Sequence, residues 1–461
     1  MSTTTPPAEA LPDASASASA DASADASADV DALDPTTERR LRRRLLPLHI
    51  AVVLQGVNLW VPVEKLFMDD IGFDPASVGI MAAAYAAVVP ALEVPSGILA
   101  DRWSRRGVLV LATLALLVSS TIGGFSHDVA TYVVGAMFLG VYFALQSGTL
   151  DAVVYDTVLE ETGRTDGFER RIGRVRLLES VGLVSSALAG GWLATIVGTR
   201  PLFFLTLPFL AASIAILLAF REPTLHHGSE PTTLRTHAVT TYRTLTQRNC
   251  LLPLVAVMVL LAVVANLMFE FGPLWLLALS ASTVVYGPHF AALASSFGVA
   301  GVLAGRFGLG NTPVVGALAA AMVAASAVLI LVPRTAPVFG AQMVLVVLAV
   351  LMTILLTARL HDAVPSAIRS SVASGVGTAT WLAFLPFSLV FGQVSQRVGV
   401  DSAAWMILGL TALSGVLLVR LSRSTGAADA AAGAPGPLVC VDVDVHVPPA
   451  TPRPAAAVAA A

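Results

Sequence analysis

Residues 97–106 read GILADRWSRR, a short charged segment that lies between two long apolar runs. Lipid tolerates neither bare ions nor unpaired backbone groups, so charges this close to apolar segments need a structural or functional reason. The segment therefore predicts a tight turn between two membrane-spanning helices, at the surface of the bilayer.

The composition extends this interpretation to the whole chain. Of 461 residues, 56% are hydrophobic and 12% are charged, and the mean hydropathy is +0.79, which a soluble globular protein could not sustain without large exposed apolar patches. The apolar runs are each roughly 20 residues long, the length that a helix needs to cross a hydrocarbon core of about 30 Å. We expect an all-α membrane protein with twelve transmembrane helices, near residues 46–67, 76–99, 107–125, 130–154, 175–197, 201–220, 251–277, 284–304, 312–332, 338–358, 370–395 and 402–420.

The charged segment resembles the loop between helices 2 and 3 of the major facilitator superfamily. The residues that carry the resemblance, and that we take as gate or motif residues, are Gly97, Leu99, Asp101, Arg102, Arg105 and Arg106, whereas Ser104 stands where the pattern has Gly. The segments EVPSG (93–97) and SGTLD (147–151) are similar to small bacterial drug-efflux permeases. The resemblance covers about residues 40–423 and implies two pseudo-symmetric six-helix bundles, with helices 1, 4, 7 and 10 around a central cavity and helices 3, 6, 9 and 12 facing lipid.

The chain departs from drug and proton antiporters of that family at two places. Span 4 contains no Arg, and Ser186 and Ala187 replace the Gly-Pro pair that precedes a double Gly in helix 5, although Gly190 and Gly191 are kept. Antiport is therefore an expectation from resemblance alone.

Polar segments divide the chain into five parts. We expect a disordered cytoplasmic N-terminal tail (1–40), an N-terminal bundle (41–220), a cytoplasmic linker (221–249), a C-terminal bundle (250–423) and a disordered cytoplasmic C-terminal tail (424–461). All but four of the 27 Lys and Arg residues fall on one face of this topology. The positive-inside rule makes that face cytoplasmic, which places both termini in the cytoplasm and the chain in the cell membrane as a multi-pass protein.

Acidic residues inside the spans form two groups, because a charge at the bilayer centre costs at least about 2.5 kcal/mol and is kept for a reason. Near the cytoplasmic ends, Glu93, Asp101 and Asp151 lie among several arginines, which predicts an inner gate built from ion pairs. Asp101 would also lie near Ser370 and Ser371, at the start of span 11. The alternative is a set of permanent pairs at the membrane interface.

The second group, Glu64 and Glu270, lies nearer the outer side in two helices that the resemblance places around the cavity. We propose Glu270 as the proton-coupling acid, with Glu64, Glu93 and Asp151 as weaker candidates. Alternatively, Glu270 pairs with a basic residue or sits among the headgroups, and Glu64 is neutralised by the adjacent Lys65.

Amides and aromatic residues in the cavity-lining spans are candidates for substrate contact. They could bind or stack on an apolar or cationic compound, although helix packing is the simpler role for any one of them. The candidates are Gln55, Asn58, Tyr142, Gln146, Asn266 and Trp381.

These observations predict a secondary active transporter that moves a small organic compound by alternating access, with proton-coupled efflux as the leading mode. Proton-coupled uptake or facilitated diffusion of a small metabolite, and a non-transporting membrane sensor or scaffold, remain alternatives. We expect neither an enzyme nor a nucleotide-driven pump, since the histidines are scattered and no phosphate-binding loop is present. We expect no cofactor, metal or nucleic acid, and a monomer whose partners are substrate, protons and lipid.

Overall fold

The computed structural model describes residues 34–164, 167–223, 251–364 and 369–432, and within these ranges all regular structure is helical. Twelve segments are long and apolar enough to cross a membrane, as predicted. The N-terminal half contains α2 (Pro35–Gly56), η1 (Val61–Val63), α3 (Glu64–Asp70), α4 (Pro75–Arg102), α5 (Arg105–Phe125), α6 (Val129–Gln146), α7 (Thr149–Thr162), α8 (Phe168–Val197) and α9 (Pro201–Ala219). The C-terminal half contains α11 (Leu251–Ala278), α12 (Thr283–Ala304), α13 (Thr312–Leu331), α14 (Thr335–Ala363), α15 (Arg369–Val398) and α16 (Val400–Ala432).

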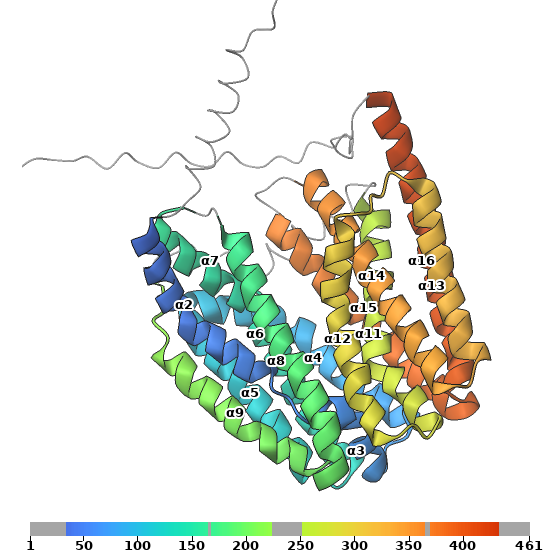
Figure 1. Cartoon of the computed structure of the whole chain (residues 1–461), viewed down its shortest axis with the longest axis horizontal. Coiled ribbons are helices and arrows are strands. Elements are labelled where there is room, and N and C mark those ends of the chain that lie inside the picture. Colours follow the sequence, from blue (N-terminus) through green and yellow to red (C-terminus); the bar gives the residue numbers. More distant parts are fainter. Residues whose placement is uncertain (1–33, 165–166, 224–250, 365–368, 433–461) are drawn as a thin grey trace, which may run out of the picture.

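The two halves lie side by side, close together at the end where α3 lies and farther apart at the end where α2 begins (Figure 1). We call the end where α2 begins the basic end, after the arginines in and next to its helix termini, and the other the opposite end. Helices α5, α9, α13 and α16 pack chiefly on helices of their own half. They therefore lie on the outside of the pair, where the resemblance places helices 3, 6, 9 and 12.

Glycines bring the two halves together at the opposite end. α4 packs along α15, and a Cβ added at Gly79 would lie 2.6 Å from the carbonyl oxygen of Ser388 and 3.1 Å from Cα of Gly392. α8 packs along α12 in the same way, where a Cβ at Gly287 would lie 2.8 Å from the carbonyl oxygen of Ala187. Small residues allow this close approach, because in a bilayer helix association depends on packing rather than on the hydrophobic effect.

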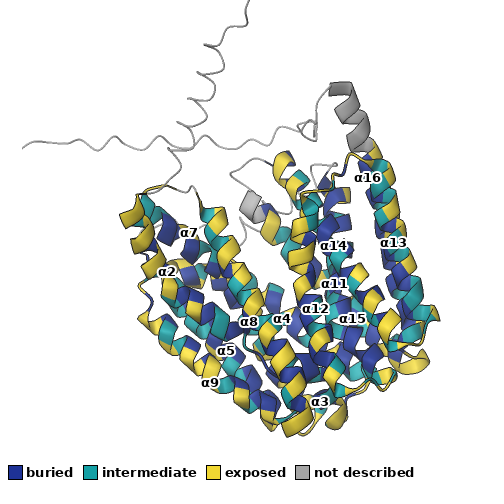
Figure 2. Ribbon diagram, in the orientation of Figure 1, coloured by how far each residue is buried: buried dark blue, intermediate teal, exposed yellow. Residues whose placement is uncertain are grey.

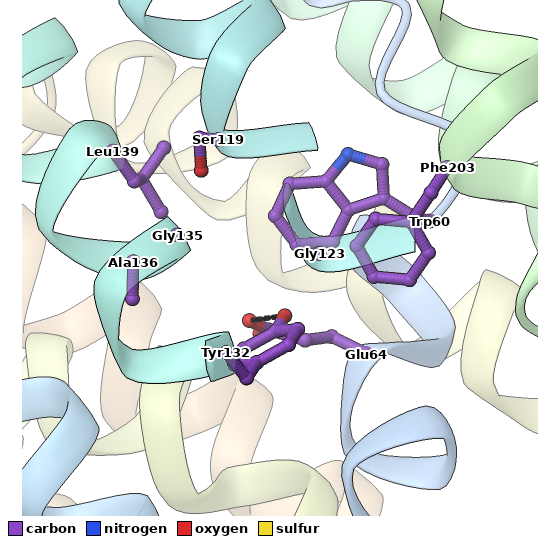
Figure 3. A pocket seen from close by; sticks show the side chains of 9 residues that line it. All are labelled: Trp60, Glu64, Ser119, Gly123, Tyr132, Gly135, Ala136, Leu139 and Phe203. Atoms are coloured by element: carbon purple, nitrogen blue, oxygen red, sulfur yellow. Dashed lines mark hydrogen bonds between the residues drawn. The ribbon is translucent and has the colours of Figure 1, made fainter. Parts of the chain in front are cut away.

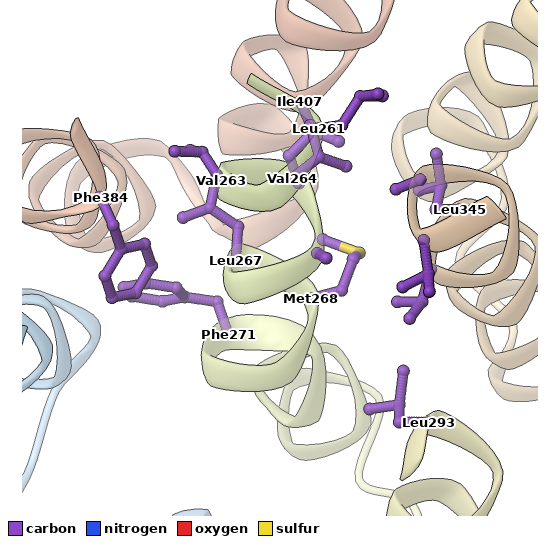
Figure 4. Packing of buried hydrophobic residues seen from close by; sticks show 14 of the residues in the cluster. Leu261, Val263, Val264, Leu267, Met268, Phe271, Leu293, Leu345, Phe384 and Ile407 are labelled. Carbon is purple, nitrogen blue, oxygen red and sulfur yellow. The ribbon is translucent and has the colours of Figure 1, made fainter. Parts of the chain in front are cut away.

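The most extensive apolar packing surrounds α11 in the C-terminal half and continues across the seam to residues such as Met68 and Val78 of the N-terminal half. Apart from Asn266 and Glu270 this helix is apolar on all sides, a pattern typical of a helix surrounded by others. Leu261, Val264 and Leu267 are fully buried, and α11 packs against α14, α15 and α16 (Figure 4). Figure 2 shows the same division, with buried residues where helices face each other and exposed residues on the outer sides.

Several helices extend past the bounds predicted for their spans. α2 begins at Pro35, inside the predicted tail, because Leu41 is buried and Arg44 bonds Glu160 (3.0 Å) and Glu161 (2.6 Å) of α7. α8 begins before residue 175, and α16 continues to Ala432, past the predicted start of the C-terminal tail. The rest of both tails and most of the linker (residues 1–33, 224–250 and 433–461) lie outside the described residues.

Two predicted spans are interrupted helices. Span 1 leaves the helical path between Gly56 and Val61, and span 4 breaks at Ser147 and Gly148, where Gly148 adopts φ +72°. Hydropathy cannot register such breaks, since a few non-helical residues do not change a window average. Protein surrounds the first break: the Leu59 N–H donates to Thr206 Oγ1 (3.1 Å), which satisfies a backbone group that lipid would leave unpaired.

Candidate functional site

A cluster of charged and hydroxyl side chains joins the halves near the opposite end. Lys65 of α3 bonds the carboxylates of Glu64 (3.0 Å) and of Glu270 on α11. Tyr85 of α4 donates to Glu270 Oε2 (2.8 Å), and Tyr132 of α6 donates to Glu64 Oε1 (2.7 Å). We call these five residues the bridging cluster.

The bridging cluster is buried and carries an unbalanced charge. The Lys65 side chain is only 3% exposed, and the two carboxylates it meets are largely buried. Two carboxylates and one ammonium leave a formal charge of −1, so one added proton would make the cluster neutral. Such a group is costly to bury in an apolar setting unless its members satisfy one another.

The interrupted first span is what places this cluster. After the break at residues 57–60, the chain restarts as η1 and α3, so that Glu64 and Lys65 begin a new short helix against α11 and α6. Gly190 of α8 lies directly against the Leu59 carbonyl, and Gly182 packs on the Val53 carbonyl in the same way. Of the double Gly retained in span 5, Gly190 therefore allows close packing around the break, whereas Gly191 packs on Gly287 of α12.

A cavity of about 10 Å³ adjoins Glu64 inside the N-terminal half, between α3, α5, α6 and α9. Figure 3 shows Glu64 and Tyr132 on one side of it, and Trp60 and Phe203 on another. Trp60 stacks on Phe203 with ring centroids 4.8 Å apart, and its indole donates to Ser120 Oγ (3.2 Å). A space of this size holds about one water molecule at most, so it is no substrate site.

An aromatic patch lies next to the bridging cluster and also spans both halves. Trp381 and Phe384 of α15 meet Tyr85 and Phe143, and the Trp381 and Phe143 rings are nearly parallel with centroids 6.1 Å apart. Tyr142 packs on Phe143. Phe384 is fully buried, whereas Phe143 and Trp381 keep exposed surface, so the patch presents an accessible aromatic face.

Glu93, predicted among the gate carboxylates, instead bonds hydroxyl groups across the seam between halves. Ser374 Oγ donates to Oε1 of Glu93 (2.8 Å) and Thr378 Oγ1 donates to Oε2 (2.5 Å). Thr378 lies one turn from Trp381 on α15, so the carboxylate and the aromatic patch share one side of that helix. Because both of these partners are neutral hydroxyl groups, neither hydrogen bond brings a positive charge to Glu93.

The motif residues gather at the basic end of the N-terminal half. Arg105 bonds Asp156 of α7 and Asp101 (3.5 Å), and Arg106 donates to the carbonyls of Leu218 and Phe220 (both 3.3 Å). Asp101 is 58% exposed, Arg102 is exposed, and Gly97 has open space around it. Ser370 and Ser371, the predicted neighbours of Asp101, lie outside the part of the chain whose side chains are described.

A second network at the same end contains Asp151. Arg176 of α8 donates to Asp151 (2.7 Å) and to Glu179 (3.2 Å), and all three side chains are substantially exposed. These pairs and those of Arg105 lie within the N-terminal half, so in this arrangement they do not join the halves.

The amide candidates lie mostly inside the N-terminal half. Gln55 donates to Thr113 Oγ1 (2.7 Å) and accepts from Gln146 (3.3 Å), while Asn58 donates to the Gln55 carbonyl (2.6 Å). All three are buried, yet among the described residues Asn58 Oδ1 and Gln146 Oε1 have no hydrogen-bond partner. Asn266 is half-buried on α11, one turn before Glu270.

Sequence reasoning missed Glu222. Its carboxylate accepts from Ser104 Oγ (2.6 Å) and from the backbone N–H groups of Arg105 (2.5 Å) and Arg106 (3.3 Å), at the N-terminus of α5, where negative charge is favoured. The available signal was its position directly after span 6, at the start of the linker. Tyr132 and the two hydroxyls that meet Glu93 were missed as well, because nothing local in the sequence marks a partner in another helix.

Within the described residues, no group of three or more His, Cys, Asp or Glu side chains is placed to hold a metal ion. One further buried titratable group, His289 of α12, meets Gln342 Oε1 of α14 (2.6 Å), and the Gln342 amide donates to the Gly272 carbonyl (3.1 Å). This chain of contacts ties the helix that carries Glu270 to its neighbours in the C-terminal half.

Comparison with known proteins agrees with this architecture. The family model of the Major Facilitator Superfamily matches residues 47–384. Multidrug resistance protein 1 of Bacillus subtilis is 24% identical over 186 residues, which cover 40% of this chain and 46% of that protein, so the chain spans under half the length of this curated relative. Multidrug resistance protein 2 of the same organism is 26% identical over 179 residues, 39% of this chain and 43% of that protein.

Solved structures resemble the chain over most of its length. The nucleoside transporter NupG matches with a TM-score of 0.65 at 14% identity, covering 83% of this chain and 98% of that one. A D-xylose-proton symporter matches with a TM-score of 0.65 at 14% identity, covering 81% and 96%. At this identity the likeness shows the fold.

Proposed function

The chain belongs to the major facilitator superfamily, and on that premise we propose that it is a secondary active transporter that exports a small organic compound in exchange for protons. The bridging cluster carries this proposal: it is buried, it joins the two halves, and it holds two carboxylates against one ammonium. Its charge balance changes with a single proton, which is what coupling requires.

The coupling step follows from the position of Glu270. Protonation of Glu270 would discharge its pair with Lys65, and Lys65 would keep Glu64 as its partner within the N-terminal half. The charged link between the halves would then be lost, and the opposite end could open. In antiport the proton is taken up from the outer side, while the opposite end is open and Glu270 is separated from Lys65. When that end closes, Lys65 replaces the proton as the partner of Glu270 and the proton leaves through the open basic end, so proton transfer and the alternation of the halves are coupled through one side chain.

We propose that the basic end faces the cytoplasm, from the distribution of arginines. The present arrangement, with the halves in contact at the opposite end, is then the one that exposes the substrate path to the cytoplasm. The aromatic patch offers that path a surface for an apolar or planar compound, and Glu93 beside it favours one with positive charge.

At the basic end we propose that Asp101 acts as the gate residue. Arg105 already holds Asp156 inside the N-terminal half, so the exposed carboxylate of Asp101 is the one available to contact the C-terminal half when this end closes. Asp101→Asn should insert normally but transport poorly. Normal transport by this variant would remove the gate from the mechanism.

The efflux direction is supported by the names of the Bacillus subtilis relatives, which are multidrug resistance proteins. A susceptibility screen in an efflux-deficient host would identify a compound, and the purified protein in proteoliposomes would then be tested with an imposed proton gradient. Antiport predicts that the compound accumulates on the acidic side and that a protonophore abolishes the accumulation. Accumulation on the alkaline side indicates symport, and equilibration without dependence on the gradient indicates facilitated diffusion.

Glu270→Gln tests the coupling residue in the same liposomes. We expect exchange of the compound across the membrane to continue while its accumulation against a gradient is lost. Accumulation that still depends on the proton gradient in this variant would assign coupling to another acid.

A further inference from the structure

A second cavity opens at the opposite end, along the seam where the two halves meet. Its volume is about 260 Å³, and its walls come from α3, α4 and the turn between them on one side, and from α11, α15 and α16 on the other. We propose that this outer cavity is a binding site for a small, mainly apolar organic cation, separate from the aromatic patch and bordered by Lys65 of the bridging cluster.

The walls of the outer cavity are mostly apolar and well packed. Phe73, Val78 and Val400 line it and are buried, and Leu274 and Leu277 of α11 complete its C-terminal side. Ligand pockets commonly combine such walls with a few polar groups that fix orientation, although this one lies at the small end of their range. It therefore suits a compact ligand of about one ring.

A polar side chain in the wall lacks a partner. Ser395 of α15 lines the outer cavity and is 3% exposed, and its hydroxyl has no hydrogen-bond partner within the described part of the chain. Buried hydroxyls are nearly always hydrogen-bonded, so an unpaired one beside a cavity indicates a group that a ligand can satisfy after rotation about one bond.

The charges around the outer cavity favour a cation. Lys65 lies at its inner wall, but its ammonium is already held by the carboxylates of Glu64 and Glu270, which lie behind the wall and bring the formal charge of this group to −1. Asp69 adds an exposed carboxylate, whereas the carboxylate of Asp74 caps α4 by accepting from the Ser77 N–H (2.8 Å). An anionic ligand would therefore meet unfavourable charge on the side formed by the N-terminal half.

Because both halves form the walls, a ligand here binds the arrangement in which the opposite end is closed more tightly than the open one. By linkage it shifts the population toward closure and stabilises the folded protein. Binding itself does not require the chain to be a transporter, so the site can be tested apart from the proposed function.

The probe is benzyltrimethylammonium, added to the purified full-length protein in detergent, with the thermal unfolding midpoint as the measurement. We expect a concentration-dependent rise with the cation, and a smaller one with neutral benzyl alcohol. Asp69→Asn should weaken the apparent affinity up to about fivefold, the range for an exposed charge. Asp70→Asn, a neighbouring exposed acid outside the lining, should leave it unchanged.

A second variant tests the location of the binding site by filling the outer cavity instead of changing its charge. Ala278→Phe fills the outer cavity from an exposed position on α11 and should abolish the rise. Equal affinity in this variant and the wild type, equal affinity for the cation and benzyl alcohol, or no rise in the wild type would each overturn the proposal. If Ala278→Phe does not fold, the comparison of Asp69→Asn with Asp70→Asn still decides it.

Discussion

Replacing either acid of the bridging cluster by its amide removes one negative charge. The two substitutions should nevertheless shift the equilibrium between the open and closed forms of the opposite end in opposite directions. Glu270 accepts from Lys65 and Tyr85 across the seam, whereas Glu64 accepts from Lys65 within the N-terminal half. Glu270→Gln therefore replaces a charged link between the halves by a neutral hydrogen bond. Glu64→Gln leaves Lys65 with Glu270 as its remaining carboxylate, which strengthens that link.

The expected size of the effect follows from the hydrogen bonds involved. A hydrogen bond to a charged group contributes about 1.5–3 kcal/mol and a neutral one about 0.5–1.5 kcal/mol, so Glu270→Gln should weaken closure of the opposite end by roughly 1–1.5 kcal/mol. The equilibrium between open and closed forms should then shift roughly tenfold toward open. The seam contacts at the glycines are unchanged in both variants, which makes Glu64→Gln a matched control.

Pulsed electron resonance between spin labels on each half measures this equilibrium. Labels at His127 and Gln396, both exposed at the opposite end, report the distance across the seam in a background from which Cys250 and Cys440 have been removed. We expect a larger population at longer distances for Glu270→Gln and none gained for Glu64→Gln. Identical distance distributions in the two variants would show that the net charge, and not the link across the seam, sets the equilibrium.

Three further substitutions test the glycine contacts between the halves, the aromatic patch and the cap of α4. Gly392→Ala places a Cβ 2.6 Å from the Pro75 carbonyl and should open the opposite end in the same measurement, whereas Gly377→Ala on the same helix meets open space and should raise thermal stability slightly. Trp381→Ala should reduce the affinity for an aromatic substrate at least severalfold, since Trp381 keeps exposed surface in the aromatic patch. Asp74→Ala should cost about 1 kcal/mol of stability by removing the cap of α4. Hydrogen bonds from Ser77 lower the pKa of Asp74, so the stabilisation by this cap is complete above pH about 4 and is lost as the pH falls through the lowered pKa. Unfolding measured at several pH values would reveal this dependence. The alanine variant should lack it.

The fold could be predicted from the sequence because its determinants are local. Span length and hydropathy each depend on about 20 neighbouring residues, and the motif at residues 97–106 added the order of the helices. The sequence did not indicate which side chains on different helices pair with one another. The alternative pairing of Glu270 with a basic residue was open, but its identification as Lys65 depends on how α3 restarts against α11, some 200 positions away in the chain.

The interrupted helices likewise could not be predicted from the average hydropathy of their spans. Gly56, Asn58 and Pro62 are a legible signal for a break in span 1, yet the apolar residues among them keep the window average high, and the span was predicted as continuous. Glu222 was overlooked because an acid at the start of a linker has many unremarkable roles. Its capping of α5 becomes evident only when α9 brings it back beside Ser104.

The distribution of contacts indicates which parts of the molecule are rigid and which can change. Within each half, helices meet through long apolar faces such as that of α11, which are costly to separate because many packed atoms lose contact together. Between the halves, the contacts include glycine backbone against backbone, the aromatic patch, hydroxyl groups against Glu93, and one ion-paired cluster with a formal charge of −1. Backbone contacts of this kind can separate without rearranging side chains, and the cluster can exchange a charge for a proton. Two rigid bundles joined by a seam of this composition can reorient as units, and in the proposed mechanism a proton at Glu270 biases which end of the seam is closed.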